Sequence, residues 1–122
     1  MNDRVRVLLV DDQPDVRLLL RITFESAGME VCGEAASAEH VLPAIQDCDP
    51  HVVVLDAMMP VTDGYEVAAS LSSDMPGLPI ILCSAFVDDR VEKAAREAGC
   101  AAVVPKDDLD ELPARVLSIL GR

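Results

Sequence analysis

Short apolar runs alternate with longer amphipathic stretches along this 122-residue chain. The apolar runs predict strands, and they lie at Val5–Val10, Met29–Val31, His51–Leu55, Leu78–Cys83 and Ala101–Val104. Helical spacing of apolar residues predicts helices at about 14–27, 37–47, 64–73, 88–98 and 108–120. Strands that are apolar throughout are typical of a parallel sheet with helices on both faces. We therefore expect an α/β fold in which five strands alternate with five helices.

Proline and glycine positions agree with this division. Pro14 suits the first turn of a helix, and Gly28 and Gly99 stand where helices should end. Pro43 interrupts the second predicted helix, so that helix should be short, kinked or begun near the proline. No linker, internal repeat or low-complexity segment divides the sequence, which predicts a single domain over residues 1–122.

The composition narrows the classes of partner. The formal net charge is −12, and the chain has one Tyr, two Phe and no Trp. Phosphate backbones and anionic membrane surfaces repel such a charge, and few aromatic rings are available to stack on bases. We therefore expect neither nucleic acid nor membrane to bind this domain.

The cysteines and the start of the sequence bear on the compartment. Four cysteines stand far apart without a C-x-x-C pair, so a zinc or redox motif is not supported. Cys32 and Cys83 lie in apolar runs, which predicts small buried packing residues. The start has no long apolar stretch and no cleavage signature. We expect reduced thiols and a cytoplasmic location.

Polar residues stand at the ends of four predicted strands. Asp11-Asp12 follows the first strand, Asp56 the third, Ser84 the fourth and Lys106 the fifth. In doubly wound sheets the ligand site lies outside the carboxyl ends of the strands, and right-handed crossovers bring those ends to one edge. We therefore expect three carboxylates, one hydroxyl and one ammonium to converge on a shallow site.

This combination of groups has a specific chemistry. Two unit charges about 4 Å apart repel by roughly 4 kcal/mol at an effective dielectric of 20, and a divalent cation reverses the sign of that interaction. A few hard oxygen ligands suit Mg²⁺, with Mn²⁺ as a substitute. Beside such a cation Asp56 could attack phosphorus and become an aspartyl phosphate. Lys106 could neutralise one phosphoryl oxygen, and Ser84 could donate a hydrogen bond to another.

The order and spacing of four segments resemble the receiver domain of two-component response regulators, along nearly the whole chain. The segments are VLLVDD, VVVLDAMMPVTDG, ILCSA and AAVVPK. The resemblance implies a doubly wound (βα)5 parallel sheet of strand order 2-1-3-4-5, which is a flavodoxin-like three-layer sandwich. It also implies a phosphorylation-dependent signalling switch, not a turnover enzyme.

The family's motifs assign a role to each polar residue. Asp56 matches the phosphoacceptor, Ser84 the residue that moves toward the phosphoryl group, and Lys106 the family's lysine. The implied Mg²⁺ ligands are Asp11, Asp12, Asp56 and the backbone carbonyl of Met58. The implied phosphoryl donor is a histidine on a sensor kinase or on a phosphotransfer protein.

Two positions depart from the family's pattern. Val103 stands three residues before the lysine, where the family often has an aromatic that rotates inward on activation. Switching should then rest on Ser84 and on shifts of the fourth helix. Pro105 precedes Lys106, and a strand tolerates a proline there if it lies at the edge of a sheet.

The implied output surface is the face formed by the fourth helix, fifth strand and fifth helix, for a downstream protein or a homodimer.

Several alternatives stay open on the residues alone. VCGEAASAE and PKDDLDEL resemble receivers that precede a DNA-binding helix-turn-helix domain, so the chain could be the N-terminal part of a longer regulator. A pseudo-receiver that binds proteins without being phosphorylated is a second alternative. Asp12 could merely cap the helix that opens at Pro14. A phosphatase of the haloacid dehalogenase type would need an Asp where Met58 stands, and the acidic DDQPD segment would repel the phosphate of a flavodoxin-like ligand.

Overall fold

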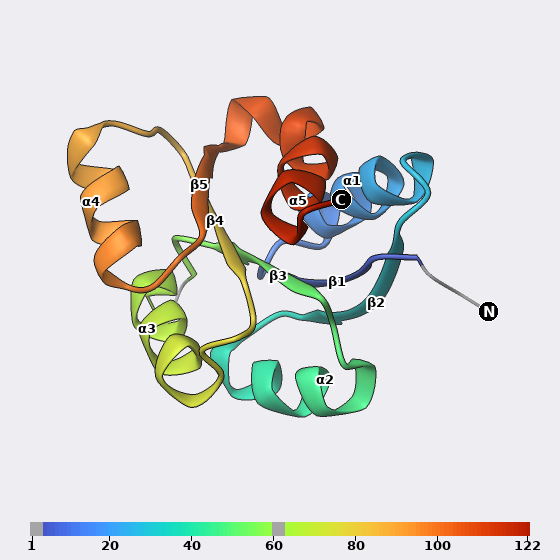
Figure 1. Cartoon of the computed structure of the whole chain (residues 1–122), viewed down its shortest axis with the longest axis horizontal. Helices are drawn as coiled ribbons and strands as arrows, with labels where there is room; N and C mark the ends of the chain where they lie inside the picture. The colour runs from blue at the N-terminus through green and yellow to red at the C-terminus, as the bar shows by residue number, and fades with distance from the viewer. Residues whose placement is uncertain (1–3, 60–62) are drawn as a thin grey trace.

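The structure is a computed structural model that describes residues 4–59 and 63–122. Five parallel strands form one sheet in the order β2-β1-β3-β4-β5 (Figure 1). The strands are β1 Arg6–Val10, β2 Glu30–Ala35, β3 Val52–Asp56, β4 Ile80–Ser84 and β5 Ala102–Pro105. The predicted α/β class and strand order are confirmed, and β5 with Pro105 lies at an edge of the sheet.

Helices cover both faces of this sheet (Figure 1). The α-helices are α1 Pro14–Ser26, α2 Val41–Cys48, α3 Gly64–Asp74, α4 Asp89–Glu97 and α5 Leu112–Leu120. Apolar residues of α1 and α5 pack on one face, whereas those of α2, α3 and α4 pack on the other. The fold is therefore a sandwich of three layers.

The second and fifth predicted helices each begin with a 3-10 segment. Ala38–His40 is a 3-10 turn ahead of α2, and Pro43 then lies in the first turn of α2, as its restricted backbone allows. Lys106–Glu111 is likewise a 3-10 segment, and α5 begins only at Leu112. Pro113 explains the later start, because a proline fits the first turn of an α-helix and disrupts its interior.

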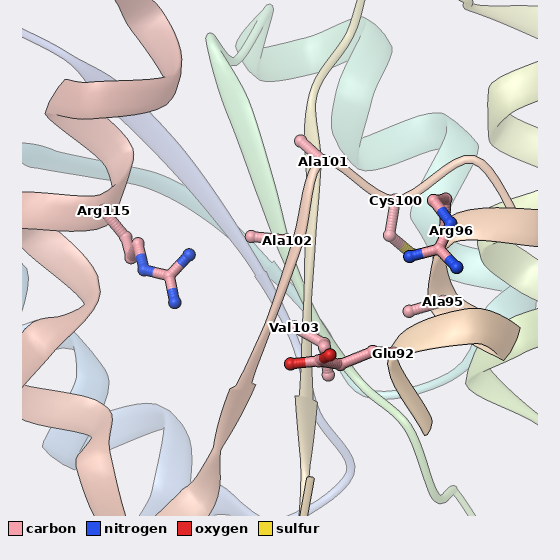
Figure 2. A pocket seen from close by; sticks show the side chains of 8 residues that line it. All are labelled: Glu92, Ala95, Arg96, Cys100, Ala101, Ala102, Val103 and Arg115. Atoms are coloured by element: carbon pink, nitrogen blue, oxygen red, sulfur yellow. The ribbon is translucent and has the colours of Figure 1, made fainter. Parts of the chain in front are cut away.

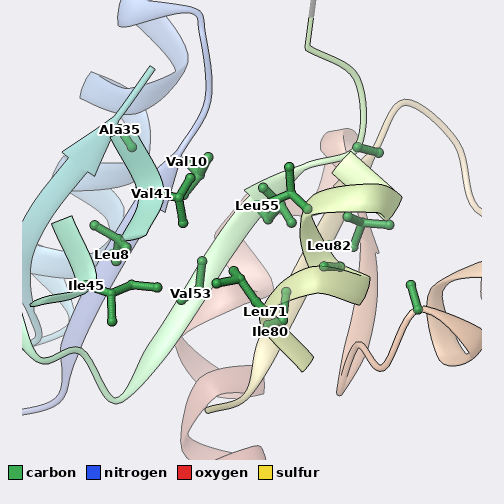
Figure 3. Close-up of a cluster of buried hydrophobic side chains, with 14 of the residues drawn as sticks. Leu8, Val10, Ala35, Val41, Ile45, Val53, Leu55, Leu71, Ile80 and Leu82 are labelled. Carbon is green, nitrogen blue, oxygen red and sulfur yellow. The ribbon is translucent and has the colours of Figure 1, made fainter. Parts of the chain in front are cut away.

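Alternate residues of the central strands enter the two halves of the core. Val53 and Leu55 of β3 pack toward α2 and α3, as Figure 3 shows, whereas Val52 and Val54 pack toward α1 and α5. All five residues of β3 are buried. Each of its four apolar side chains contributes roughly 1.5–3 kcal/mol when removed from water, so this strand holds its carboxyl end in a fixed place.

The expectation of four free thiols is wrong for two of them. Cys32 of β2 and Cys48 at the end of α2 form a disulfide, with their Cα atoms 5.5 Å apart. Cys83 and Cys100 are free. Cys83 is a buried packing residue as predicted, and burial, followed by the charge of Asp56, raises the pKa of its thiol to about 12. Such a thiol forms little thiolate and is unreactive.

Among the residues that the structure describes, none of the helices has both the length and the apolar character that crossing a membrane requires.

Candidate functional site

The carboxyl ends of β1, β3, β4 and β5 meet at one edge of the sheet. Their parallel pairing sets Val10 beside Leu55, Asp56 beside Cys83, and Ser84 beside Pro105. The residue that ends or follows each strand therefore faces the same region. The four predicted strand ends converge as expected from the sequence.

Three carboxylates gather at this edge. Asp11, Asp12 and Asp56 each offer an oxygen, and these oxygens all lie within 4.8 Å of one another. Asp11 and Asp56 are buried, and Asp12 is half-buried. Such a set of hard oxygen donors, with Asp12 open to solvent, fits a hydrated divalent cation such as Mg²⁺.

Asp11 is held at three of its polar atoms. Its N–H donates to the carbonyl of Ala35 over 3.0 Å, and its Oδ1 accepts from the N–H of Gln13 over 2.9 Å. Its carbonyl accepts from Nη1 of Arg17 over 2.6 Å. Burial, followed by the charge of Asp56, raises the pKa of the Asp11 carboxyl, whereas the hydrogen bond from Gln13 opposes the rise. The hydrogen bonds thus hold the Asp11 carboxylate where burial and the charge of Asp56 destabilise its ionised form.

Asp56 is paired with the cation of the site. Nζ of Lys106 lies 2.9 Å from Oδ1 of Asp56, and the same oxygen accepts from the N–H of Met58 over 3.1 Å. Burial alone would lower the pKa of Lys106, but the hydrogen bond and the charge of Asp56 outweigh it, so that pKa is raised. Lys106 therefore carries its charge beside the Asp56 carboxylate at neutral pH.

Gly64 shapes the loop behind Asp56. A Cβ at this position would collide with the carbonyl oxygen of Asp56 and lie 2.8 Å from Cα of Ala57. Gly64 N–H donates to the carbonyl of Ala57 over 3.0 Å, and the Asp63 carboxylate caps α3 by accepting from Tyr65 N–H over 2.7 Å. The sequence indicated only a turn and a helix start at Asp63-Gly64, because a close approach of two backbones is not visible in it.

The other predicted residues also lie at this edge. Ser84 is buried, with 8% of its surface exposed, at the last position of β4. The Met58 side chain is 73% exposed, so only its backbone faces Asp56. The N-cap of α1 is Gln13, and no side chain caps this helix. Asp12 is therefore not a helix cap.

Known proteins with the same arrangement identify the fold family. The chain is similar to the chemotaxis protein CheY of Thermotoga maritima, with 30% identity over 117 residues that cover 96% of this chain and 95% of that protein. It is also similar to a protein-glutamate methylesterase/protein-glutamine glutaminase of Hahella chejuensis, with 38% identity over 103 residues. That match covers 82% of this chain and 29% of the relative, so the chain spans less than a third of its length.

A solved structure and a family model agree with these relatives. A two-component response regulator of the LuxR family from Aurantimonas has a TM-score of 0.89 and 28% identity, covering 98% of this chain and 88% of that chain. The family model of the response regulator receiver domain matches residues 7–117. Receiver domains bind Mg²⁺ in an acidic pocket, and this chain has a cluster of three aspartates at the corresponding edge of its sheet. The chain belongs to the response regulator receiver domain family of two-component signal transduction.

Proposed function

We propose that this receiver domain works as a phosphorylation-dependent switch whose phosphoacceptor is Asp56. The observation that carries the assignment is the pairing of Lys106 with the buried Asp56 carboxylate beside two further aspartates. A bound Mg²⁺, held by the three carboxylates and the Met58 carbonyl, would neutralise charge on the transferred phosphoryl group.

The residues of the site support an in-line transfer. An Asp56 carboxylate oxygen forms the new O–P bond while the N–P bond of a partner's phosphohistidine breaks, and the departing imidazole keeps the electron pair. Lys106, already 2.9 Å from Asp56, pairs with a phosphoryl oxygen, and the Ser84 hydroxyl donates to another. The product carries about −1.5 to −2 charge at neutral pH, which drives the conformational change. The partner kinase or phosphotransfer protein is part of this proposal.

Intact-mass spectrometry tests the acceptor. We expect acetyl phosphate with Mg²⁺ to add one phosphoryl group, EDTA to prevent the addition, and Asp56→Asn to abolish it. The matched control is Asp110→Asn, because Asp110 is exposed and outside the site. Labelling of Asp56→Asn would refute the acceptor assignment, and an unlabelled wild type would favour a pseudo-receiver.

The output surface in this proposal is the face of α4, β5 and α5. Figure 2 shows Arg96 from α4 on one side of β5 and Arg115 from α5 on the other. A hollow of about 230 Å³ lies between them, and its lining includes Ala102 and Val103. Small residues on β5 leave this space, and Val103 stands where the family often has an aromatic. The hollow has room for an apolar side chain of a partner.

The arginines on this face indicate the charge of the partner. Over residues 4–59 and 63–122, the arginines without an ion pair or hydrogen bond are Arg90, Arg96 and Arg115. Two of these three line the hollow beside one acidic residue, Glu92, so the lining carries a net positive charge although the chain as a whole has a net charge of −12. Guanidinium groups recognise carboxylates in bidentate pairs. The partner we propose is therefore an acidic protein segment that inserts one apolar side chain.

Fluorescence anisotropy tests this surface with a labelled peptide of four carboxylate residues around one leucine. We expect the phosphorylated domain to bind it, and the double variant Arg96→Glu, Arg115→Glu to lose the binding. Arg90→Glu is the matched control, because Arg90 is also unpaired but does not line the hollow. Equal loss in the control would show a general charge effect, and equal binding of a basic peptide would contradict the charge argument.

The whole protein's output is a further proposal. The chain spans about half of a curated response regulator of Synechocystis and less than a third of the methylesterases. A DNA-binding domain, a methylesterase domain or a free-standing receiver each fits these relatives. We propose that this domain performs phosphotransfer and autodephosphorylation only, in the cytoplasm, as one domain over residues 1–122. The gene sequence on both sides of this stretch distinguishes the three outputs.

A further inference from the structure

A bulge in the edge strand β2 decides which way Glu34 points. Val7 pairs with Val31, but Leu8 pairs with Gly33, so Cys32 is an extra residue on β2. Val31 packs on the side of α1 and α5, whereas Ala35 packs on the side of α2. Without the extra residue, positions 31 and 35 would share a face, because side chains alternate with a period of two. The bulge thereby directs position 34 toward α1.

Glu34 meets two arginines of α1 there. Its Oε1 accepts from Nε of Arg17 over 2.8 Å, and its Oε2 accepts from Nη2 of Arg21 over 2.5 Å. The hydrogen bond from Arg21 is the main cause of the lowered pKa of Glu34, so its carboxylate is charged at neutral pH. One carboxylate therefore fixes two guanidinium groups on the helix that follows the Asp11 loop.

A second edge of the Arg17 guanidinium forms a hydrogen bond with the backbone of the candidate metal ligand Asp11. While Nε binds Glu34, Nη1 donates to the carbonyl of Asp11 over 2.6 Å. The Asp11 N–H is held at the same time by the carbonyl of Ala35, the residue after Glu34. The end of β2 thus holds Asp11 from both sides of its backbone, once directly and once through Arg17.

We propose that Arg17, oriented by Glu34, is a positioning residue for the metal ligand Asp11. The inference rests on the proposed function, because it concerns the same aspartate cluster. Without a metal the clustered carboxylates repel one another, and Asp11 stands at the end of a strand where its backbone could move away. A guanidinium fixed at two edges resists that movement. A lysine cannot replace it, because an ammonium lacks the planar fork that reaches both partners.

A purely structural role is the competing explanation, since the same contacts also tie α1 to β2. Arg21 separates the two roles. It shares Glu34 and lies one helical turn beyond Arg17, and its side-chain hydrogen bonds go to Glu34, not to Asp11. A structural role predicts similar losses for both arginines, whereas a positioning role predicts a selective loss for Arg17.

Calorimetric titration of the unphosphorylated domain with Mg²⁺, together with thermal unfolding in EDTA, tests the proposal. We expect Arg17→Lys to raise the Mg²⁺ dissociation constant about tenfold, the lower end of the range for groups that orient metal ligands. Arg21→Lys should leave that constant close to the wild-type value, because the side-chain hydrogen bonds of Arg21 go to Glu34 and not to Asp11. Both variants should lower the unfolding temperature in EDTA.

Two results would overturn the proposal. One is an unchanged dissociation constant in Arg17→Lys, and the other is an equal increase in both variants. These failures differ from a failure of the proposed function, in which wild type would not bind Mg²⁺ or Asp56→Asn would bind it as wild type does.

Discussion

Asp11→Asn should stabilise the metal-free domain while strongly reducing its stabilisation by Mg²⁺. The carboxylate oxygens lie within 4.8 Å of one another, so at an effective dielectric of 20 each pair repels by about 3.5 kcal/mol. The charge of Lys106 offsets part of the repulsion between Asp11 and Asp56, and solvent screens the repulsion between Asp11 and the half-buried Asp12. We therefore expect a net gain of about 1–2 kcal/mol from neutralising Asp11. Asparagine keeps the Oδ1 acceptor for Gln13, so the loop geometry is retained.

Thermal unfolding with and without Mg²⁺ measures both effects. A domain of 122 residues loses roughly 0.26 kcal/mol of stability per degree near its midpoint, so the expected gain in EDTA is about 4–8 °C. Mg²⁺ at about 100 times its dissociation constant should stabilise the wild type by roughly 2.7 kcal/mol. The variant should gain much less, because it lacks one charged ligand. The order of stability of the two proteins should therefore reverse when Mg²⁺ is added.

Asp110→Asn is the matched control, since it makes the same charge change at an exposed position in the segment before α5. It should respond to Mg²⁺ as the wild type does. An Asp11→Asn variant that is less stable than wild type in EDTA would refute the repulsion argument. A variant that gains as much as wild type from Mg²⁺ would refute the ligand assignment.

Three further perturbations have defined outcomes. Gly64→Ala should destabilise the domain by about 2 kcal/mol or more, because the new Cβ collides with the Asp56 carbonyl oxygen, and denaturant unfolding measures this loss. The same variant should slow phosphorylation of Asp56, which intact-mass spectrometry follows. Cys48→Ser removes a disulfide that closes a loop of 16 residues, so it should lower the free energy of unfolding by about 3 kcal/mol without reductant. With reductant, denaturant unfolding of the variant and of wild type should give nearly the same stability. The arginine partners lower the pKa of Glu34 in the folded domain below the ordinary 4.5, so the Glu34 carboxylate contributes fully to folding stability above pH 4.5 and loses this contribution as the pH falls through its folded-state pKa. Acid unfolding of Glu34→Gln should therefore lack that component of the wild-type curve.

The edge of the sheet that carries the aspartate cluster could be predicted because it depends on local rules. An apolar run that ends in Asp56 identifies a buried strand and its last residue, and parallel strands place such ends together. The same reasoning located Ser84 and Lys106, since each stands at the carboxyl end of its own strand. The family's strand order placed the fifth strand at the edge of the sheet, where the missing N–H of Pro105 is tolerated.

The contacts that support this edge were not predictable in the same way. A side chain that binds a distant backbone leaves no periodic signal, so nothing in the sequence connects Arg17 to the Asp11 carbonyl or Glu34 to Arg17. The later start of α5 was missed as well, because helical spacing continues through the segment while Pro113 interrupts the hydrogen bonding.

The sequence by itself determined the layers, the strand order through the family resemblance, and the edge where Asp11, Asp12 and Asp56 meet. The layers and the edge followed from the sequence because continuous apolar runs identify buried strands, and the polar residue after each run marks the end of a strand. Only the tertiary structure decided the Cys32–Cys48 disulfide and the bulge that turns Glu34 toward α1. Both depend on how α2 and α1 pack against β2, and such packing is set by side chains far apart in sequence.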